Sequence, residues 1–232
     1  MISQYSKATD IDREFWQDYR KAVYWLNKKL SPMRQKWKIY DEAWEVENFR
    51  RDYSFSEPVF YTSPQTGNRW LSWITTKKVD GELHFYSRIV LYYLTEKYMT
   101  MMLPITTVID AEKGEEERCE IHGVNVYTAH MFQRMADPDR LGVDMSDRIR
   151  TMRNFAEFVA TGWSDTRPPR KGERHTQIML RTPASWIRGH TVMVGDRHVT
   201  IYRTFWTDRS MSYQQMKDVR SFKKFADARM NI

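Results

Sequence analysis

Strand-like segments joined by short turns constrain the fold more than any other feature of this chain. Residues 57–95 read as antiparallel β structure, in which PVFYTS meets RWLSWITTKK through the turn SPQTGN. The next turn contains Asp80-Gly81, a dipeptide that favours a tight β-hairpin. Three more strand-like runs, TQIMLRT, SWIRGHTVMV and RHVTIYRTFW, follow one another near the C-terminus. The pattern predicts an antiparallel sheet in the middle of the chain and a three-stranded meander near its end.

Between these two regions the sequence leaves the choice between helix, strand and loop more open. The run LHFYSRIVLYYLT is rich in β-branched and aromatic residues, although beyond Ile89 it could turn helical. Pro104 is expected to end that segment, and PITTVIDA and GVNVYT each read as a strand. Residues 110–120 form an acidic run that is expected to be a loop.

Helical periodicity near the N-terminus predicts a helical hairpin. Apolar residues recur at three- and four-residue steps over residues 11–30, after a cap at Thr9 or Asp10. The Ser31-Pro32 pair is expected to end this helix, and its proline can open a second helix that runs to about Phe49. The charged residues on the other faces of both helices are most simply a solvated surface.

Three further helices are expected in the second half. They cover residues 129–135, residues 146–159 with Ser146 as N-cap, and a last helix that begins after a capping box of Ser212 and Gln215. The chain is therefore expected to have an α+β fold, with an N-terminal helical hairpin, an antiparallel sheet and a C-terminal helix–helix–three-strand–helix unit. Two arrangements remain open, which are one continuous domain or separate units of residues 1–117 and 118–232.

Charge and composition narrow the class of partner. The chain of 232 residues is 41% hydrophobic, which is enough to bury a core. Lys and Arg outnumber Asp and Glu by 37 to 30, and the net charge of +7 favours an anionic partner, nucleic acid first. The alternative is a basic protein with no polyanion ligand. Aromatic residues make up 14% of the chain, and those beside Arg could stack on unpaired bases, although most should be core.

The single cysteine excludes a disulfide within this chain and any zinc site built from several cysteines. Cys119 lies in the acidic run GEEERCE, where negative charge disfavours the thiolate, so we expect it to be inert. The N-terminal residues lack the apolar core of a signal peptide, and the longest apolar stretch is too short to span a bilayer. We therefore expect a cytoplasmic location and no membrane partner.

His130 and Arg134 are the first candidate site. They lie four residues apart on a predicted helix and so project from one face. Histidine can transfer protons near neutral pH, and the planar fork of arginine fits phosphate oxygens. The alternative is a partly buried histidine bonded to backbone, with the arginine in a surface ion pair.

The C-terminal strands carry further candidates. Alternation places Arg181 on one face of its strand, and Arg188 and His190 together on one face of the next. Charged groups in the middle of a small sheet need partners, since an unpaired buried charge is costly. The partner could be a bound phosphate, or a carboxylate such as Glu157 or Asp208. Gly189 removes a side chain where backbone or ligand could approach closely.

This order of elements and residue types resembles the barnase/colicin/RelE-like endoribonuclease toxins, which cleave RNA without metal by activating the ribose 2′-hydroxyl. The resemblance covers residues 123–220 and leaves the long N-terminal half outside it. It implies that His130 transfers protons. It also implies that phosphate is neutralised by Arg134, Arg181, Arg188 and Arg203, with His190, Tyr202 and Thr204 as further catalytic candidates.

Other basic residues could contact a nucleic-acid backbone without catalysis. They lie in the loop TRPPRKGERH and on a stripe of the last helix, and comprise Arg167, Arg170, Lys171, Arg174, Lys217, Arg220 and Lys224. The leading hypothesis is RNA binding with metal-independent endoribonuclease activity. The alternatives are a non-enzymatic nucleic-acid-binding or assembly protein of a phage or mobile element, and a protein-interaction module that uses exposed Trp70, Trp73 or Trp163.

No metal or cofactor is expected. The chain has no HExxH, no Cys/His cluster, no phosphate-binding glycine loop and no GxSxG elbow. The acidic residues of DPDRLGVDMSD could hold Mg²⁺, but their spacing matches no calcium loop and a polar connection is the simpler interpretation.

Overall fold

The computed structural model describes residues 6–35, 39–46, 49–79, 82–109, 118–160, 162–182 and 185–230. It confirms the α+β class, with helices that pack against a large and mostly antiparallel sheet. The first half contains α1 (Ala8–Gln35), β1 (Ile39–Val46), β2 (Phe49–Ser56), β3 (Val59–Thr62), β4 (Arg69–Val79), β5 (Glu82–Leu94) and β6 (Met99–Ile109). The second half contains β7 (Arg118–Tyr127), α2 (Ala129–Ala136), α3 (Arg148–Ala160), β8 (Trp163–Arg167), β9 (Thr176–Thr182), β10 (Ser185–Val194), β11 (Arg197–Trp206) and α4 (Tyr213–Met230).

One sheet runs through both halves of the chain. Its strand order is β1-β2-β4-β5-β6-β7-β11-β10-β9-β8, with β3 paired to β4. Neighbours are antiparallel except at β7 and β11, which pair in parallel over His198–Gly123 to Tyr202–Tyr127. The sheet therefore continues across the position near residue 117 where two separate units could have met.

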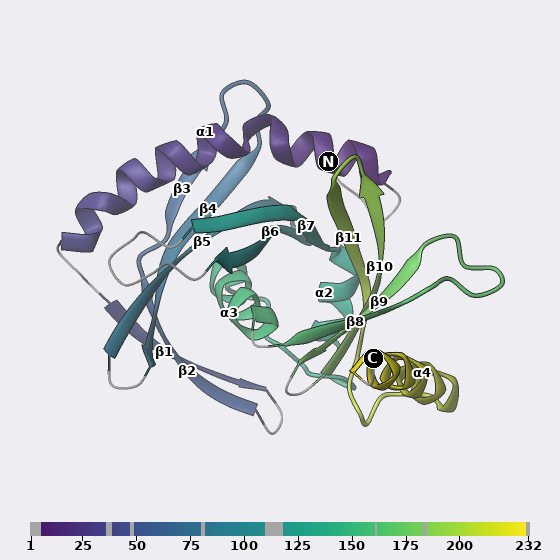
Figure 1. The fold of residues 1–232 in the computed structure, drawn as a ribbon. Helices are drawn as coiled ribbons and strands as arrows, with labels where there is room; N and C mark the ends of the chain where they lie inside the picture. Colours follow the sequence, from purple (N-terminus) through teal and green to yellow (C-terminus); the bar gives the residue numbers. More distant parts are fainter. Residues whose placement is uncertain are drawn as a thin grey trace.

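The curved sheet has helices on both faces (Figure 1). Helices α2 and α3 lie inside the curve, while α1 runs along the outer side and α4 lies outside the β8–β10 end. The inner core joins α2 and α3 to most strands and includes Trp73, Tyr127 and Phe155. The outer core joins α1 to the sheet and includes Phe15 and Trp70, and a small third cluster holds α4.

Buried polar contacts fix helix α1 on the outer face at two places. Near its start, Asp12 accepts two hydrogen bonds from Arg197, whose Nε and Nη2 lie 2.9 and 2.6 Å from the carboxylate oxygens. One turn and a half further on, the buried Asp18 accepts hydrogen bonds from Ser63, Thr66 and Asn68 in the turn before β4. Both carboxylates are thus satisfied by partners from strands or turns far along the chain.

The predicted second helix over residues 32–49 is wrong. Helix α1 continues through the Ser31-Pro32 pair to Gln35, and the following residues form the antiparallel β1–β2 hairpin. The aromatic and β-branched residues of IYDEAWEV also fit a two-residue period, and they favour strand where two segments can pair. A proline near a helix end removes a single hydrogen bond, which α1 tolerates in its last turn.

Three smaller expectations also need correction. The segment beyond Ile89 stays in β5 and does not turn helical. Pro104 does not end an element but lies inside β6, two residues past the last β5–β6 pair of Leu91 and Met102 and beside a bulge at Ile105/Thr106. The first-turn cap of α3 is Asp147, which accepts from the Arg150 backbone N–H at 2.9 Å, and not Ser146.

Other expectations agree with the structure. Strands β9, β10 and β11 form the predicted meander, and Ser212 and Gln215 bond each other's backbone N–H as a capping box. Strand β8 is an addition that the sequence did not indicate. The Asp80-Gly81 turn and residues 110–117 lie outside the described residues, while β4 and β5 pair up to Val79 and Glu82 on either side of that turn. Within the described part, no helix is both long and apolar enough to cross a bilayer.

Candidate functional site

A pocket of about 550 Å³ opens on the outer face of β9, β10 and β11. Its lining is rich in arginine and histidine. The residues are Gly172, Arg174, His175, Gln177, Arg188, Gly189, His190, Arg203 and Thr204. Because no Asp or Glu is among these described lining residues, the pocket presents basic and neutral groups alone.

Strand register explains why these side chains meet. His190 pairs with Gln177 of β9, and Arg188 pairs with Thr204 of β11, so alternate residues of three strands point to one face. The register shifts between Arg188 and Gly189, which leaves Arg203 as the extra residue of a bulge. The bulge therefore brings both Arg203 and Thr204 of β11 to the pocket.

Gly189 is required by the backbone. A Cβ atom at this position would lie 2.4 Å from the carbonyl oxygen of Ile201 on β11. The sequence predicted that backbone or ligand approaches closely at Gly189, and in the structure it is the backbone of β11. The missing side chain lets β10 and β11 come together beneath the pocket.

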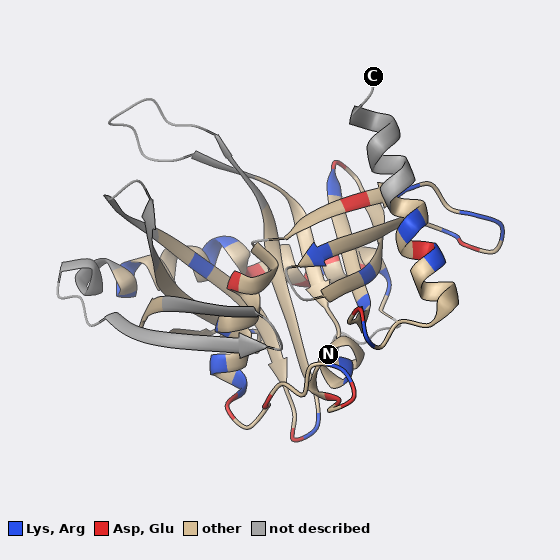
Figure 2. Cartoon of the chain, turned by 90° about the horizontal axis from the view of Figure 1, so that it is seen from below, with Lys and Arg blue, Asp and Glu red and all other residues tan. Residues whose placement is uncertain are grey.

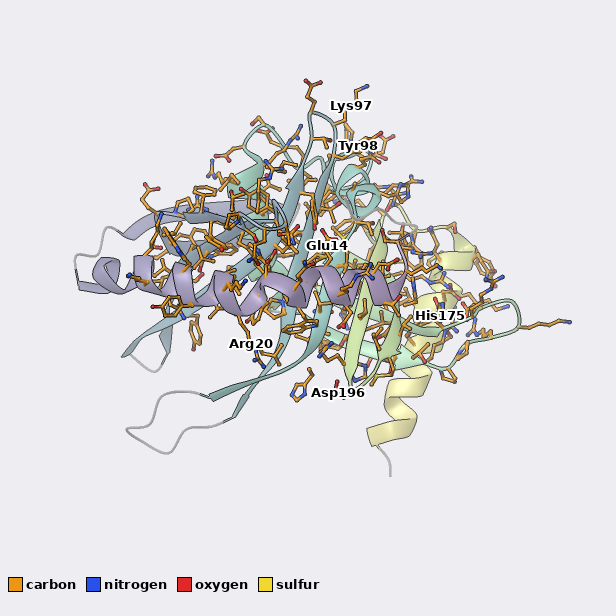
Figure 3. The ribbon with its side chains drawn as sticks, turned by 90° about the horizontal axis from the view of Figure 1, so that it is seen from above. Glu14, Arg20, Lys97, Tyr98, His175 and Asp196 are labelled. Atoms are coloured by element: carbon orange, nitrogen blue, oxygen red, sulfur yellow. The ribbon has the colours of Figure 1, made fainter. Side chains whose placement is uncertain are left out.

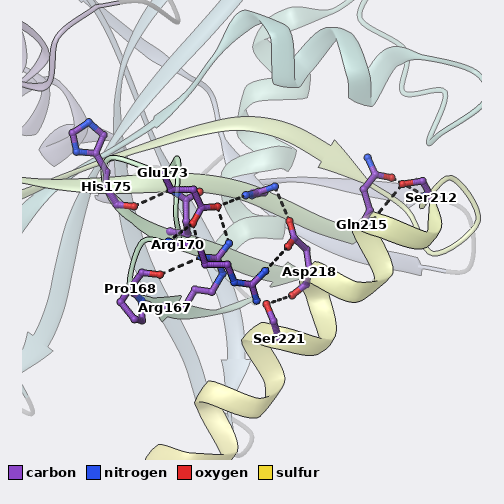
Figure 4. Close-up of polar contacts among 11 residues, drawn as sticks. Arg167, Pro168, Arg170, Glu173, His175, Ser212, Gln215, Asp218 and Ser221 are labelled. Atoms are coloured by element: carbon purple, nitrogen blue, oxygen red, sulfur yellow. Dashed lines mark hydrogen bonds and ion pairs between the residues drawn. The ribbon is translucent and has the colours of Figure 1, made fainter.

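An ion-pair network supports the pocket from one side (Figure 4). Glu173 accepts from both terminal nitrogens of Arg167, at 2.6 and 2.8 Å, and from Arg188 at 2.9 Å. Asp218 of α4 pairs with Arg188 at 2.8 Å and with Arg170 at 3.2 Å. The carboxylate partners of Arg188 are therefore Glu173 and Asp218, and not the Glu157 or Asp208 that the sequence suggested.

The network also shifts acidities. The pKa of Glu173 is lowered to about 2, chiefly by the hydrogen bonds from Arg167. The Arg170 backbone N–H and the charges of Arg167 and Arg188 act in the same direction, against the opposing effect of burial. Glu173 thus stays ionised at neutral pH and neutralises part of the local positive charge. Three arginines share two carboxylates, which leaves this supporting network with one net positive charge.

Two imidazoles stack at the pocket. The rings of His175 and His190 have centroids 5.3 Å apart and an interplanar angle of 20°. Burial, followed by the charge of Arg203 and the neighbouring His175, lowers the pKa of His190 to about 4. His190 is therefore neutral at pH 7, with one ring nitrogen able to accept a proton or a hydrogen bond.

His130 and Arg134 do not join this pocket. They lie on α2, whose buried residues Met131, Phe132 and Met135 belong to the inner core together with Ile187 and Tyr202. Because Arg188 and His190 alternate with Ile187 along β10, the two groups of candidates lie on opposite faces of the sheet. The pKa of His130 is lowered by burial and then by the charges of Arg134 and Arg140.

The remaining catalytic candidates divide between core and surface. Tyr202 is 2% exposed and stacks on Tyr127 in the inner core, with centroids 4.9 Å apart. Arg181 lies between the rings of Trp163 and Trp186 at 4.9 and 5.1 Å. Thr204 lines the pocket. Of the group suggested by the strands, the pocket thus holds Arg188, His190, Arg203 and Thr204.

The candidate phosphate contacts also differ in accessibility. Arg167 is 1% exposed and pairs with Glu173 and the ring of Phe222, so it cannot reach a ligand from solvent. Lys171 and Arg174 are exposed on the loop between β8 and β9, and Lys217 and Arg220 are exposed on α4. Figure 2 shows basic positions on both segments. The side chain of Lys224 lies outside the described residues.

Two further suggestions change with the structure. Trp70 and Trp73 are fully buried, so they cannot form the exposed aromatic surface of a protein-interaction module, while Trp163 is 56% exposed. In the acidic segment, Asp144 bonds Ser146 and Asp147 caps α3. Among the described residues no group of three or more His, Cys, Asp or Glu side chains is placed to hold a metal ion.

Sequence reasoning missed His175, Gln177, Glu173 and Asp218 as parts of the site. His175 is the last residue of the basic loop, and Gln177 shares a face of β9 with Arg181, so both could have been proposed from their positions in the sequence. Asp218 lies on α4, far from β10 in sequence, and no local pattern indicates its contact with Arg188. The chain matches no protein-family model, no curated protein and no solved structure.

Proposed function

We propose that this protein binds RNA and that the pocket on β9–β11 receives a backbone phosphate. The observation that carries the proposal is a cavity large enough for a phosphate and its sugar, with Arg174, Arg203 and His190 in its wall and no carboxylate lining it. Guanidinium groups bind phosphate oxygens through charge-assisted hydrogen bonds, and each phosphate contact adds to a salt-dependent affinity. The net charge of +7 supports the same class of partner.

The binding test uses a fluorescently labelled single-stranded RNA and anisotropy at several salt concentrations. We expect the Arg174→Ala/Arg203→Ala variant to bind about 10- to 100-fold more weakly, with a salt slope smaller by about 2, because two phosphate contacts are lost. Lys97→Ala is the matched control, since Lys97 is exposed in the β5–β6 turn, apart from His175 (Figure 3). Equal affinities of the double variant and the wild type would exclude the pocket as the phosphate site.

The neutral state of His190 favours a second function, which is RNA cleavage without metal. In this reaction the ribose 2′-hydroxyl gives its proton to His190, and its oxygen attacks the phosphorus to form a 2′,3′-cyclic phosphate. The bond to the 5′-oxygen breaks, and that oxygen takes a proton from water or from the stacked His175. Arg203 would stabilise the added negative charge on phosphorus. This is the chemistry implied by the resemblance to RelE-like toxins, moved from His130 to His190.

Incubation with total cellular RNA in excess EDTA separates the two candidate histidines. We expect cleavage by the wild type, its loss in His190→Ala and its retention in His130→Ala. Loss in His130→Ala alone would place the chemistry on α2 instead. Absence of cleavage by the wild type, with RNA binding intact, would leave RNA binding as the function.

A further inference from the structure

Helix α1 carries a second basic surface, on the side that faces away from the sheet. Two columns of side chains run along it with a spacing of four residues. The first is Arg20, Tyr24 and Lys28, and the second is Lys21, Trp25 and Lys29. Since residues four apart lie one above another on a helix, each aromatic ring has a cation one turn before it and one turn after it. We call these six residues the α1 surface.

The α1 surface is exposed and lacks acidic partners. All six side chains are exposed, and Tyr24 is 70% and Trp25 44% accessible. From Tyr19 to Gln35 the helix contains no Asp or Glu. Within the described part of the chain, none of the four cations forms an ion pair, and Lys21 donates a hydrogen bond to the neutral Gln65 at 2.7 Å. Their charge is therefore available to an external anion.

The aromatic rings are placed for stacking. Trp25 stacks on Tyr61 of β3, with centroids 5.6 Å apart and an angle of 29°, and Lys29 lies 4.5 Å from the Trp25 ring centroid. These contacts hold Trp25 in one orientation at the edge of the α1 surface. The Tyr24 ring has no ring contact with a described residue, so its face is open to a ligand.

We propose that the α1 surface binds single-stranded nucleic acid, with an unpaired base stacked on Tyr24 and phosphates held by the flanking cations. Alternating cations and aromatic rings are what an unpaired strand requires, because its bases expose their faces while its backbone carries the charge. An anionic membrane fits less well. The apolar side of α1, with Phe15, Leu26 and Leu30, is buried on the sheet and cannot enter lipid.

The inference rests on the proposed function, because it specifies the RNA as single-stranded and adds a second point of contact. The α1 surface and the pocket lie on the same outer face of the sheet, on which Val199 and Ile201 of β11 pack under α1 and His190 faces the pocket. A strand bound in the pocket could therefore continue across α1.

The test compares a uridine RNA oligomer with the same oligomer annealed to an adenosine oligomer. We expect Tyr24→Ala to bind the single strand about 5- to 100-fold more weakly, because stacking on one base is lost, and to bind the duplex as the wild type does. Tyr24→Phe, which keeps the ring, should retain wild-type affinity. Tyr213→Ala is the matched control, since Tyr213 is 76% exposed on α4, and it should change neither affinity.

Charge variants complete the test. Arg20→Ala/Lys28→Ala should lower the salt slope for the single strand by about 2. Unchanged single-strand affinity in Tyr24→Ala would overturn the inference, as would wild-type protein that binds phosphatidylserine vesicles and no RNA. If Tyr24→Ala loses affinity while Arg174→Ala/Arg203→Ala does not, the pocket proposal fails and this one stands. If Arg174→Ala/Arg203→Ala loses affinity while Tyr24→Ala does not, the pocket proposal stands and the proposal for the α1 surface fails.

Discussion

At the scale of single residues, the protein separates arginines that hold the fold from arginines that face solvent. Arg167, Arg188 and Arg197 each meet a carboxylate within 3 Å. Arg174 has no hydrogen bond or ion pair with another described residue and stands exposed at the pocket. Since a paired guanidinium has few donors left for a ligand, accessibility and pairing together select Arg174 for testing.

The first residue-scale prediction concerns the acidity of His190. We expect its ring protons, followed by NMR, to titrate with a midpoint near pH 4, because burial and the charge of Arg203 disfavour the imidazolium ion. Arg203→Ala should raise that midpoint, although not to the ordinary value of 6.5, since burial is the larger cause. A wild-type midpoint near 6.5 would show that the ring is solvated and would weaken its role as proton acceptor.

The second residue-scale prediction concerns Glu173 and stability in acid. Its folded-state pKa of about 2 lies below the ordinary value of 4.5, so the folded protein binds fewer protons than the unfolded chain between these limits. The stabilisation from its ion pairs is therefore complete above pH 4.5 and is lost as the pH falls through about 2. We expect the unfolding free energy of the wild type to fall more steeply over this window than that of Glu173→Gln. If the unfolding free energies of the wild type and Glu173→Gln change in parallel with pH, the ion pairs of Glu173 do not stabilise the fold.

At the scale of elements, a buried carboxylate links α3 to the sheet. Glu157 is fully buried, accepts a hydrogen bond from Thr75 of β4 at 2.7 Å and pairs with Arg88 of β5 at 3.0 Å. We expect Glu157→Gln to lower the unfolding free energy in urea by about 2–4 kcal/mol, because Arg88 loses its counter-charge in a partly buried site. The exposed Asp10–Arg13 pair provides a control, since Asp10→Ala should cost less than about 1 kcal/mol. Similar losses of unfolding free energy in Glu157→Gln and Asp10→Ala would show that Glu157 does not hold α3 to the sheet.

The elements also show where sequence patterns are sufficient. Strands β9 to β11 were predictable because their alternation is uninterrupted, and α2 and α3 because each has a clear apolar stripe. The segment from Ile39 to Ser56 was not predictable as strand, because its aromatic residues fit both a helical and a two-residue period. Pairing with β4, which no local signal encodes, selects the strand.

At the scale of the whole molecule, the β7–β11 pair joins the two parts of the sheet, β1–β7 and β8–β11. Gly123 of β7 lies opposite His198, and a Cβ atom there would lie 1.9 Å from the His198 carbonyl oxygen. We expect Gly123→Ala to push the two strands apart and to cost about 3 kcal/mol or more in unfolding free energy. Asn125→Ala, two residues along the same strand and only half-buried, should cost about 1 kcal/mol or less. Equal stability of Gly123→Ala and the wild type would show that the strands can separate freely.

The candidate site was only partly predictable, because it depends on contacts between residues that are far apart in the sequence. Alternation placed Arg188 and His190 on one face, but the bulge that adds Arg203 and the contact with Asp218 depend on how β10, β11 and α4 pack. The sequence grouped His130 with these residues by type, whereas the sheet places them on opposite faces. Residue types in the sequence therefore did not by themselves locate the pocket, because its walls depend on how distant strands and helices pack.

The two anchors of α1 have a consequence for synthesis on the ribosome. Asp18 bonds residues 45 to 50 positions later, whereas Asp12 bonds Arg197, which is 185 positions later. As a nascent chain emerges in order, the middle of α1 can dock early on the β3–β4 turn, while its first turns must wait until β11 has left the exit tunnel. We therefore expect ribosome-bound chains halted before β11 to be cleaved by trypsin at Lys7 or Arg13, and completed chains to resist. The start of α1 would then be secured only after the strands that follow it in the sequence have been made.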